Sequence, residues 1–176
     1  MRHVFDYLVA IDPGTKASGV CLLSTNDMKP IWCAKLCNHY VIATTLSQIY
    51  NLRLIGAEIT YRVVIERMQG NNMPVSSDVF ETCEWIGRFT EGFSSLYKTD
   101  VSYVYRREEY KALCSNIYTH NDKGVRQALV DRFAYGEKNY GKGTKKEPGW
   151  FYGFSADSWS AYAVGVTYLD KLEGQA

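Results

Sequence analysis

The sequence predicts an α/β fold with a mixed five-stranded sheet and helices on both of its faces. Three short apolar segments come first and are separated only by brief turns, which predicts three antiparallel strands. Two further apolar segments each follow a helical segment, which predicts parallel pairing through strand–helix–strand units. A length of 176 residues with 46% hydrophobic residues fits one domain spanning residues 1–176.

The three antiparallel strands are expected at residues 7–12, 19–24 and 31–36. The first is an apolar run that ends in a carboxylate and is followed by Pro13-Gly14-Thr15. Proline and glycine favour a tight turn, so the second strand should run back beside the first. Asn and Asp at residues 26–27 mark the turn to the third strand.

The next elements are a helix over about residues 40–57, a strand over 61–66, a helix over 77–97 and a strand over 101–105. Apolar residues three or four positions apart predict the helices. Short continuous apolar runs predict the strands, because a strand buried on both faces has no polar side.

The last third of the chain should be mainly helical. Helices are expected near residues 107–114 and 121–134, and a glycine-rich loop over 136–149 precedes a final helix over 155–172. Small residues in the final helix should let it approach the sheet closely: Ala156, Ala161, Ala163 and Gly165.

Cysteine usage and hydropathy restrict the class of protein. The five cysteines are an odd number with irregular spacing, and only Cys33 and Cys37 lie close together, so we expect free buried thiols. No apolar run approaches the roughly 20 residues that span a bilayer. Residues 1–6 do not resemble a signal peptide. We therefore expect a cytoplasmic protein without a membrane partner.

Positive charge is concentrated in one part of the chain. Residues 105–146 contain ten Lys and Arg against five Asp and Glu, whereas the whole chain has a net charge of +1. A basic segment of this kind suits a polyanion such as nucleic acid, although a solvated helical face would give the same pattern.

Three carboxylates stand at positions that favour a shared site. Asp12 ends the first predicted strand, Glu66 ends the fourth, and Asp157 opens the last helix. If the first and fourth strands are parallel neighbours, both acids emerge at one sheet edge, where ligands bind in open α/β sheets. Clustered carboxylates need a cation, and oxygen-only donors suit Mg²⁺ or Mn²⁺. Two such ions can catalyse phosphodiester hydrolysis.

Each acid also has a structural interpretation. Asp12 could begin a turn, Glu66 could pair with Arg62 or Arg67, and Asp157 could favour the helix dipole. The joint arrangement is more specific than any one of the three.

The three acidic segments resemble the motifs of one known family. Residues 11–20, Ile-Asp-Pro-Gly-Thr followed by Gly-Val, resemble the first motif of RuvC-type Holliday-junction resolvases. Residues 63–66 are similar to the second acidic strand of the family, and residues 156–163 resemble its C-terminal acidic helix. The segment from Gly143 to Trp159 is most similar to phage and prophage members. In a phage-encoded member, the expected location is the cytoplasm of the bacterial host.

This resemblance implies a ribonuclease-H-like fold and a Mg²⁺-dependent endonuclease of DNA recombination and repair. A homodimer would nick two strands of a four-way junction, with Mn²⁺ as a substitute metal. Asp12, Glu66 and Asp157 would then be the catalytic metal ligands. The family often has another acid three residues before the last one, where this chain has Phe154.

Basic residues near these motifs are candidates for contacts with DNA phosphates. Lys142, Lys145 and Lys146 lie on the loop before the last acid, and Arg106 and Arg107 follow the fifth strand. The lysines could equally form a solvated loop.

The loop after the fourth strand contains Met73, which the resemblance places at the junction centre as a wedge against an unstacked base. Met73 could instead be a turn anchor. The helix over 77–97 has a stripe formed by Val79, Cys83, Ile86 and Phe93, with further bulk at Phe80, Trp85, Phe89 and Leu96. We expect it to pack against its twin in a homodimer, the alternative being full burial within one chain.

Three other functions fit parts of the pattern. A YqgF-like nuclease acting on structured RNA has a similar opening motif, and a non-catalytic junction-binding protein would share the basic surface. Actin-like ATPases and sugar kinases also use an Asp-x-Gly-Thr loop, but they need two such domains. A metal-dependence assay on a junction, a linear duplex and structured RNA separates these possibilities.

Overall fold

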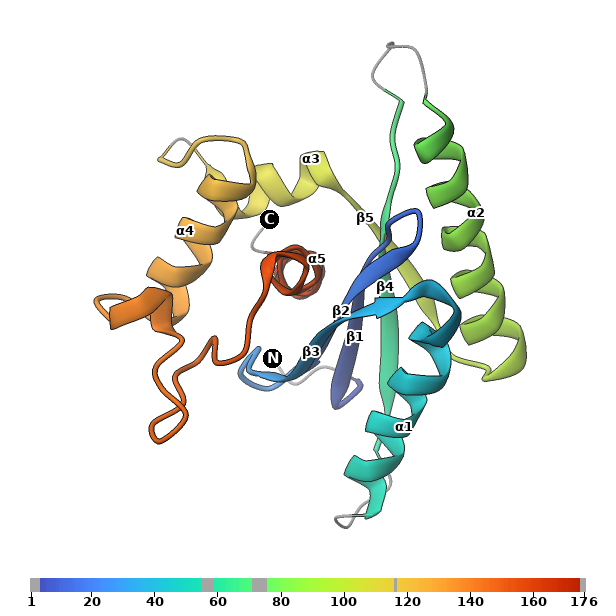
Figure 1. The fold of residues 1–176 in the computed structure, drawn as a ribbon, viewed down its shortest axis with the longest axis horizontal. Coiled ribbons are helices and arrows are strands. Elements are labelled where there is room, and N and C mark those ends of the chain that lie inside the picture. The colour runs from blue at the N-terminus through green and yellow to red at the C-terminus, as the bar shows by residue number, and fades with distance from the viewer. Residues whose placement is uncertain (1–3, 55–58, 71–75, 116, 175–176) are drawn as a thin grey trace.

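The computed structural model describes residues 4–54, 59–70, 76–115 and 117–174, and one five-stranded sheet runs through its centre (Figure 1). The strand order is β3-β2-β1-β4-β5. β1 pairs antiparallel with β2, as β2 does with β3, whereas β1–β4 and β4–β5 are parallel. The strands are β1 (Tyr7–Asp12), β2 (Ala17–Ser24), β3 (Pro30–Cys37), β4 (Tyr61–Arg67) and β5 (Val101–Tyr105). The predicted fold class is confirmed.

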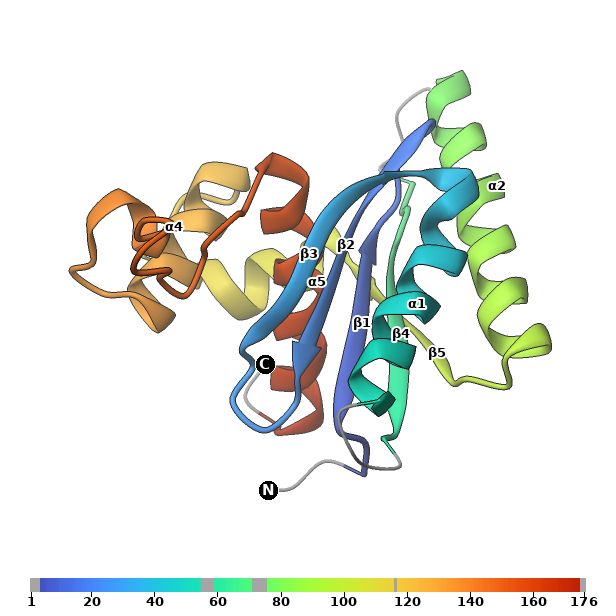
Figure 2. The same ribbon diagram turned by 60° about the horizontal axis from the view of Figure 1, so that its bottom comes forward.

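Helices cover both faces of the sheet, as Figure 2 shows in side view. One face carries α1 (Val41–Leu54), which follows a 3-10 turn at Asn38–Tyr40, and α2 (Ser77–Glu91), which continues into a π-helical segment at Gly92–Leu96. The predicted helix over 40–57 thus ends at Leu54, and residues 55–58 lie outside the described residues.

The opposite face carries α5 (Ala156–Leu172), with the shorter helices packed beyond it (Figures 1 and 2). These are α3 (Arg106–Glu109), a π-helical segment at Tyr110–Cys114, α4 (Asp122–Phe133) and a 3-10 turn at Lys138–Gly141. The two faces have separate apolar clusters, so the sheet is the middle layer of three.

Side-chain alternation along the strands divides the core between these layers. In β1, Val9 and Ile11 belong to the cluster under α1 and α2, whereas Leu8 and Ala10 belong to the cluster under α5. α5 approaches the sheet closely at Gly165, where an added Cβ would lie 2.9 Å from Leu23 Cδ2 and 3.1 Å from Ala10 Cβ. The close approach expected from its small residues is present.

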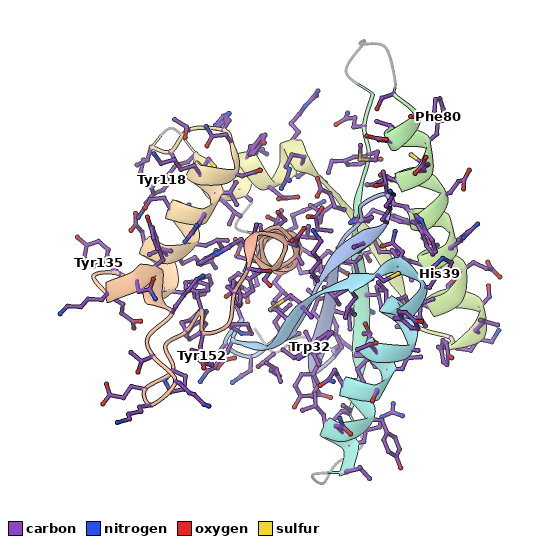
Figure 3. All side chains as sticks on the ribbon, viewed as in Figure 1. Trp32, His39, Phe80, Tyr118, Tyr135 and Tyr152 are labelled. Atoms are coloured by element: carbon purple, nitrogen blue, oxygen red, sulfur yellow. A yellow bond between two sulfur atoms is a disulfide. The ribbon has the colours of Figure 1, made fainter. Side chains whose placement is uncertain are left out.

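The buried stripe of α2 differs from the prediction at one end. Thr82, Ile86 and Phe89 face the sheet, and Phe93 continues the stripe in the π-helical segment. Cys83 is exposed, contrary to the prediction, because it lies one position round the helix from Thr82. Trp85 is partly buried and Phe89 fully buried, so the bulk left on the outer surface belongs to Phe80 and Leu96 (Phe80 is labelled in Figure 3).

Free buried thiols were expected at all five cysteines, and that expectation is wrong for four of them. Cys21 and Cys33 are joined in a disulfide, because they are paired residues of neighbouring strands with Cα atoms 4.1 Å apart. Cys37 and Cys83 are free but exposed, and Cys114 is free and buried. Within the described part of the chain, no helix is long and apolar enough to cross a membrane.

Candidate active site

Asp12 and Glu66 stand next to each other at the carboxyl ends of two parallel strands. β1 and β4 pair in register as far as Ile11 and Ile65, and the two acids are the next residues of their strands. Both side chains therefore lie on the α5 face of the sheet. Their carboxyl groups share a hydrogen bond, and Glu66 is 8% exposed.

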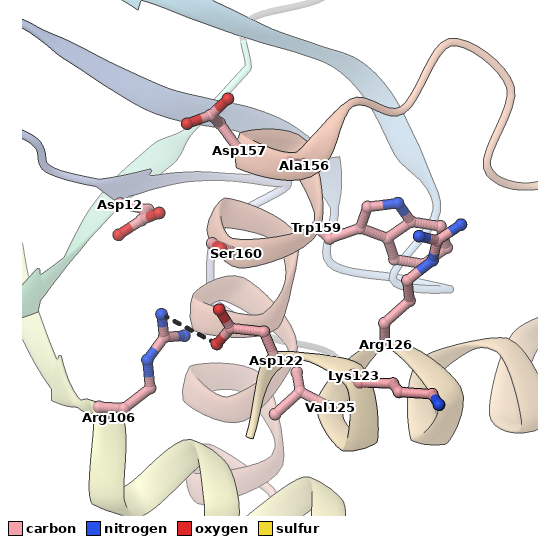
Figure 4. A pocket seen from close by; sticks show the side chains of 10 residues that line it. All are labelled: Asp12, Arg106, Asp122, Lys123, Val125, Arg126, Ala156, Asp157, Trp159 and Ser160. Atoms are coloured by element: carbon pink, nitrogen blue, oxygen red, sulfur yellow. Dashed lines mark ion pairs between the residues drawn. The ribbon is translucent and has the colours of Figure 1, made fainter.

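A third buried acid, Glu109, approaches the pair through Arg106. The Arg106 Nη1 donates to Glu109 Oε2 at 2.9 Å, and its Nε lies 3.4 Å from Glu66 Oε1. Glu109 is fully buried, and its Oε1 atom has no hydrogen-bond partner. Arg106 also lies 3.5 Å from Asp122 Oδ1 on α4, a contact drawn in Figure 4. One guanidinium thus faces three carboxylates.

This crowding shifts the pKa values of the acids. Burial, with the added repulsion of Glu109 and Asp12, raises the pKa of Glu66 to about 9. Burial also raises the pKa of Asp12, although the hydrogen bond from Glu66 and the charge of Arg106 oppose the shift. Burial raises the pKa of Glu109 to about 7 against the opposing effect of Arg106. The hydrogen bond between the two lowers the pKa of Asp12 and raises that of Glu66, so Glu66 is its donor.

Arg106 keeps its charge in this environment. Burial acts against the charged form, but Glu109, Glu66 and Asp12 outweigh burial and raise the pKa of Arg106 above its ordinary value. Without metal, its guanidinium is the cation that balances the buried acids.

Asp157 reaches the same region from the first turn of α5. It lines a cavity of about 450 Å³ together with Asp12 and Ser160, and Ser160 hydrogen-bonds Asp12 (Figure 4). Its Oδ1 lies 3.2 Å from Lys35 Nζ on β3. Gly19 makes this position possible, because a Cβ there would lie 2.3 Å from the main-chain oxygen of Asp157.

The structure brings the three predicted acids together only in part. Asp12 and Glu66 are in contact, whereas the Asp157 carboxylate, whose charge helps to raise the pKa of Asp12, is paired with Lys35 of β3. Across the described ranges, no three His, Cys, Asp or Glu residues are close enough to hold one metal ion. The expectation of a single converged triad is thus met for two members. The expected raised pKa is present at both.

The predicted basic residues have different surroundings. Arg106 is occupied by the acids rather than extended towards solvent, and the Lys142 ammonium donates to the Phe154 carbonyl at 2.6 Å. Arg107, Lys145 and Lys146 are exposed. Met73 lies outside the described residues.

A second cavity, of about 540 Å³, lies on the other side of Asp12 and Arg106. It is lined by Glu66 and by the basic residues Arg67 and Arg107. The two cavities share Asp12 and Arg106 and together form a depression across the carboxyl ends of β1 and β4.

Several residues of this region were missed from the sequence, among them Glu109 and Arg126. Glu109 stands three residues after Arg106, a spacing that allows a salt bridge within a helix. Arg126 lines the first cavity from α4, and only its membership of the basic segment pointed to it.

Comparison with known proteins places this fold in the ribonuclease-H-like class. No protein-family model matches the sequence, and no curated protein does. Among solved structures, RuvC of Thermus thermophilus in complex with a Holliday-junction substrate matches with a TM-score of 0.65, at 12% identity over 97% of both chains. A second structure of Thermus thermophilus RuvC gives 0.64 and 13%, covering 97% of this chain and 98% of the other. The chain therefore has a RuvC-like fold.

Proposed function

We propose that this protein is a metal-dependent endonuclease that hydrolyses phosphodiester bonds in four-way or branched DNA. The observation that carries the proposal is the contact between Asp12 and Glu66, buried at the carboxyl ends of neighbouring parallel strands in a RuvC-like fold. Two adjacent carboxylates in an apolar layer destabilise a fold, so their presence calls for a functional reason.

The donor set fits a hard divalent cation. Asp12 and Glu66 offer carboxylate oxygens, no imidazole or thiolate stands among the described residues that line the two cavities, and Glu109 Oε1 is a buried acceptor without a partner. We assign Asp12 and Glu66 as the residues that would hold Mg²⁺, with Mn²⁺ as a substitute, and Asp157 would join them by leaving its ion pair with Lys35. When bound, the ion would supply an activated water and neutralise charge on the phosphate.

The residues of the chain have separate roles in this proposal. Arg106 balances Glu66 and Glu109 before metal binds, and Ser160 orients Asp12 through its hydrogen bond. Lys35 holds Asp157 at the cavity wall. Arg107, Lys145 and Lys146 are exposed cations that contact DNA phosphates on either side of the depression.

Two nicks in a junction with two-fold character call for two active sites related by a two-fold axis. We propose that a homodimer supplies them through α2. Its outer surface exposes Phe80 by 62%, and the segment after it exposes Leu96 by 73%, so both can contribute apolar area to an interface. The similarity of residues 143–159 to phage members supports a phage or prophage origin and action in the host cytoplasm.

The test is cleavage of a synthetic four-way junction by the purified protein with Mg²⁺, Mn²⁺ or EDTA. Linear duplex and structured RNA are the control substrates. Asp12→Asn should abolish cleavage, because it removes a metal ligand, while leaving junction binding in Ca²⁺ near wild type. Asp27→Asn is the matched control, because Asp27 lies on the β2–β3 turn at the other end of the sheet.

Each outcome of this assay has a defined meaning. Metal-dependent cleavage of the junction alone supports the proposal. Preference for structured RNA would favour a YqgF-like nuclease instead. Binding without cleavage under any metal would make the protein a junction-binding protein, and wild-type cleavage by Asp12→Asn would exclude this active site.

A further inference from the structure

Arg126 lies between two aromatic rings at the wall of the first cavity. Its Cζ atom is 4.1 Å from the ring centroid of Tyr140 and 4.9 Å from that of Trp159. Figure 4 shows the side chain beside Trp159, on the cavity that also contains Asp12 and Asp157. The two aromatic rings therefore hold the guanidinium in place at the cavity wall.

Both rings are themselves fixed by the fold. Trp159 belongs to α5, two residues after Asp157, and packs on the buried Phe151 with ring centroids 4.4 Å apart. Tyr140 comes from the 3-10 turn Lys138–Gly141, where its backbone is left-handed with φ 55°. A left-handed tyrosine costs conformational energy, and such positions concentrate at functional sites.

Within the described part of the chain, the charge of Arg126 is not held in a salt bridge, although Asp12, Asp122 and Asp157 line the same cavity. Among the described residues, no Asp or Glu forms an ion pair with Arg126, whereas Arg106 and Arg132 each do. The Nε atom is buried and has no hydrogen-bond partner. Protein atoms cover this Nε, so a ligand in the cavity would meet the terminal nitrogens of the guanidinium instead.

The chemistry of Arg126 restricts the kind of partner that it would bind. The two cation–π contacts hold the guanidinium at the wall of a cavity that it lines, where it offers a positive charge and planar N–H donors. In-plane donors of arginine match the oxygens of a phosphate in a bidentate contact. Lys123 lines the same cavity and adds a second positive charge.

We propose that Arg126 binds a phosphodiester of the substrate strand next to the one that is cut. This inference rests on the proposed nuclease function and extends it by naming a subsite. The strand would cross the depression with its scissile phosphate at Asp12 and a neighbouring phosphate at Arg126. Because Trp159 and Asp157 are on the same turn of α5, this contact fixes the strand relative to the proposed metal ligands.

The first experiment measures junction affinity in Ca²⁺ by fluorescence anisotropy over a series of salt concentrations. Arg126→Met keeps the packing between the rings but removes the charge, so affinity should fall about ten- to a hundredfold. The slope of log affinity against log salt should become shallower by about one phosphate contact. Arg126→Lys restores a charge without the planar donors and should recover part of both effects.

Arg53→Met is the matched control, because Arg53 is an exposed arginine of α1 on the opposite face of the sheet. It should leave both affinity and salt slope unchanged. Thermal unfolding of all variants checks that the fold is intact. If Arg126→Met is folded and binds like wild type, the inference is wrong.

A second experiment identifies the phosphate. Junctions with one neutral methylphosphonate at successive positions around the cut should show one position that weakens wild-type binding but does not weaken Arg126→Met further. If each methylphosphonate weakens the binding of wild type and of Arg126→Met by the same factor at every position, Arg126 contacts no particular phosphate and acts only through packing. A wild-type protein that binds no branched DNA would overturn the nuclease proposal itself, whereas wild-type cleavage with an unaffected variant overturns only the Arg126 subsite.

Discussion

The two faces of the sheet are formed by the same strands but differ at the strands' carboxyl ends. Towards α1 and α2, the side chains stay apolar to the end of the parallel pair, with Ile11 and Ile65 packed near Phe89. Towards α5, the next residues are Asp12 and Glu66, and a buried apolar layer changes into a buried acidic one. The first face is apolar to the strand ends, whereas the second buries acidic side chains that lower the stability of the fold and form the proposed active site.

The largest expected effect tests the stabilising face. Phe89→Ala removes a fully buried ring beneath α2 and should lower the free energy of unfolding by about 3–5 kcal/mol. Urea denaturation followed by circular dichroism measures it. Phe80→Ala on the exposed side of the same helix is the control and should change stability by less than about 0.5 kcal/mol. Equal effects at both positions would contradict the burial pattern of α2.

The second prediction concerns the contact between β2 and the start of α5. Gly19→Ala places a Cβ 2.3 Å from the Asp157 main-chain oxygen, so backbone must move, at a cost of about 1–3 kcal/mol. Cleavage should fall with stability because Asp157 moves. Gly87→Ala, where an added Cβ meets nothing within 4 Å, should instead stabilise α2 by about 0.5–1 kcal/mol. If Gly19→Ala keeps wild-type stability and cleavage, the close contact between Gly19 and Asp157 does not position Asp157 for activity.

The third prediction is that the buried Glu66 makes the stability of the protein depend on pH. The pKa of Glu66 is about 9 in the folded protein but has the ordinary glutamate value of 4.5 in the unfolded chain. Between these values the folded state holds more protons, so stability in EDTA should fall as pH rises, by up to about 1.4 kcal/mol per pH unit. Glu66→Gln should flatten this dependence. Denaturation of both proteins at pH 5, 7 and 9 measures this dependence. If the unfolding free energy of Glu66→Gln falls with pH as steeply as that of wild type, the pKa of Glu66 is not raised.

The smallest effect on stability is expected at the proposed dimer surface. Phe80→Asp should leave the monomer's unfolding free energy within about 0.5 kcal/mol, since the ring is already exposed. It should, however, shift sedimentation at micromolar concentration from dimer to monomer. Tyr50→Asp, an equally exposed aromatic on α1, should not do so. A wild-type monomer, with or without junction DNA, would exclude this dimer.

The order of the elements and the positions of Asp12 and Glu66 were predictable from the sequence. Strand polarity follows from connection length, and parallel neighbours present their carboxyl ends together. The contact of Glu109 with Arg106 was not predictable, because it depends on how a short helix turns after β5. The wrong burial of Cys83 is local, since Ile86 is buried as predicted but Thr82, rather than Cys83, faces the sheet one turn before it.

The hydrogen-bond, salt-bridge and disulfide partners of individual side chains could not be predicted from the sequence either. Lys142 and Arg106 look like free cations in the printed chain, yet one is bonded to a carbonyl and the other to three carboxylates. Cys21 and Cys33 meet only because β2 and β3 adopt one particular register. Long side chains reach partners that become neighbours only in the folded state.

The hydrogen bond of Lys142 connects the loop before α5 to the residues that lead into this helix. Its ammonium holds the Phe154 carbonyl, and the Gly143–Pro148 bridge closes the loop that presents Lys145 and Lys146. Phe154 precedes Asp157 by three residues, so this one hydrogen bond holds the closed loop next to the first turn of α5.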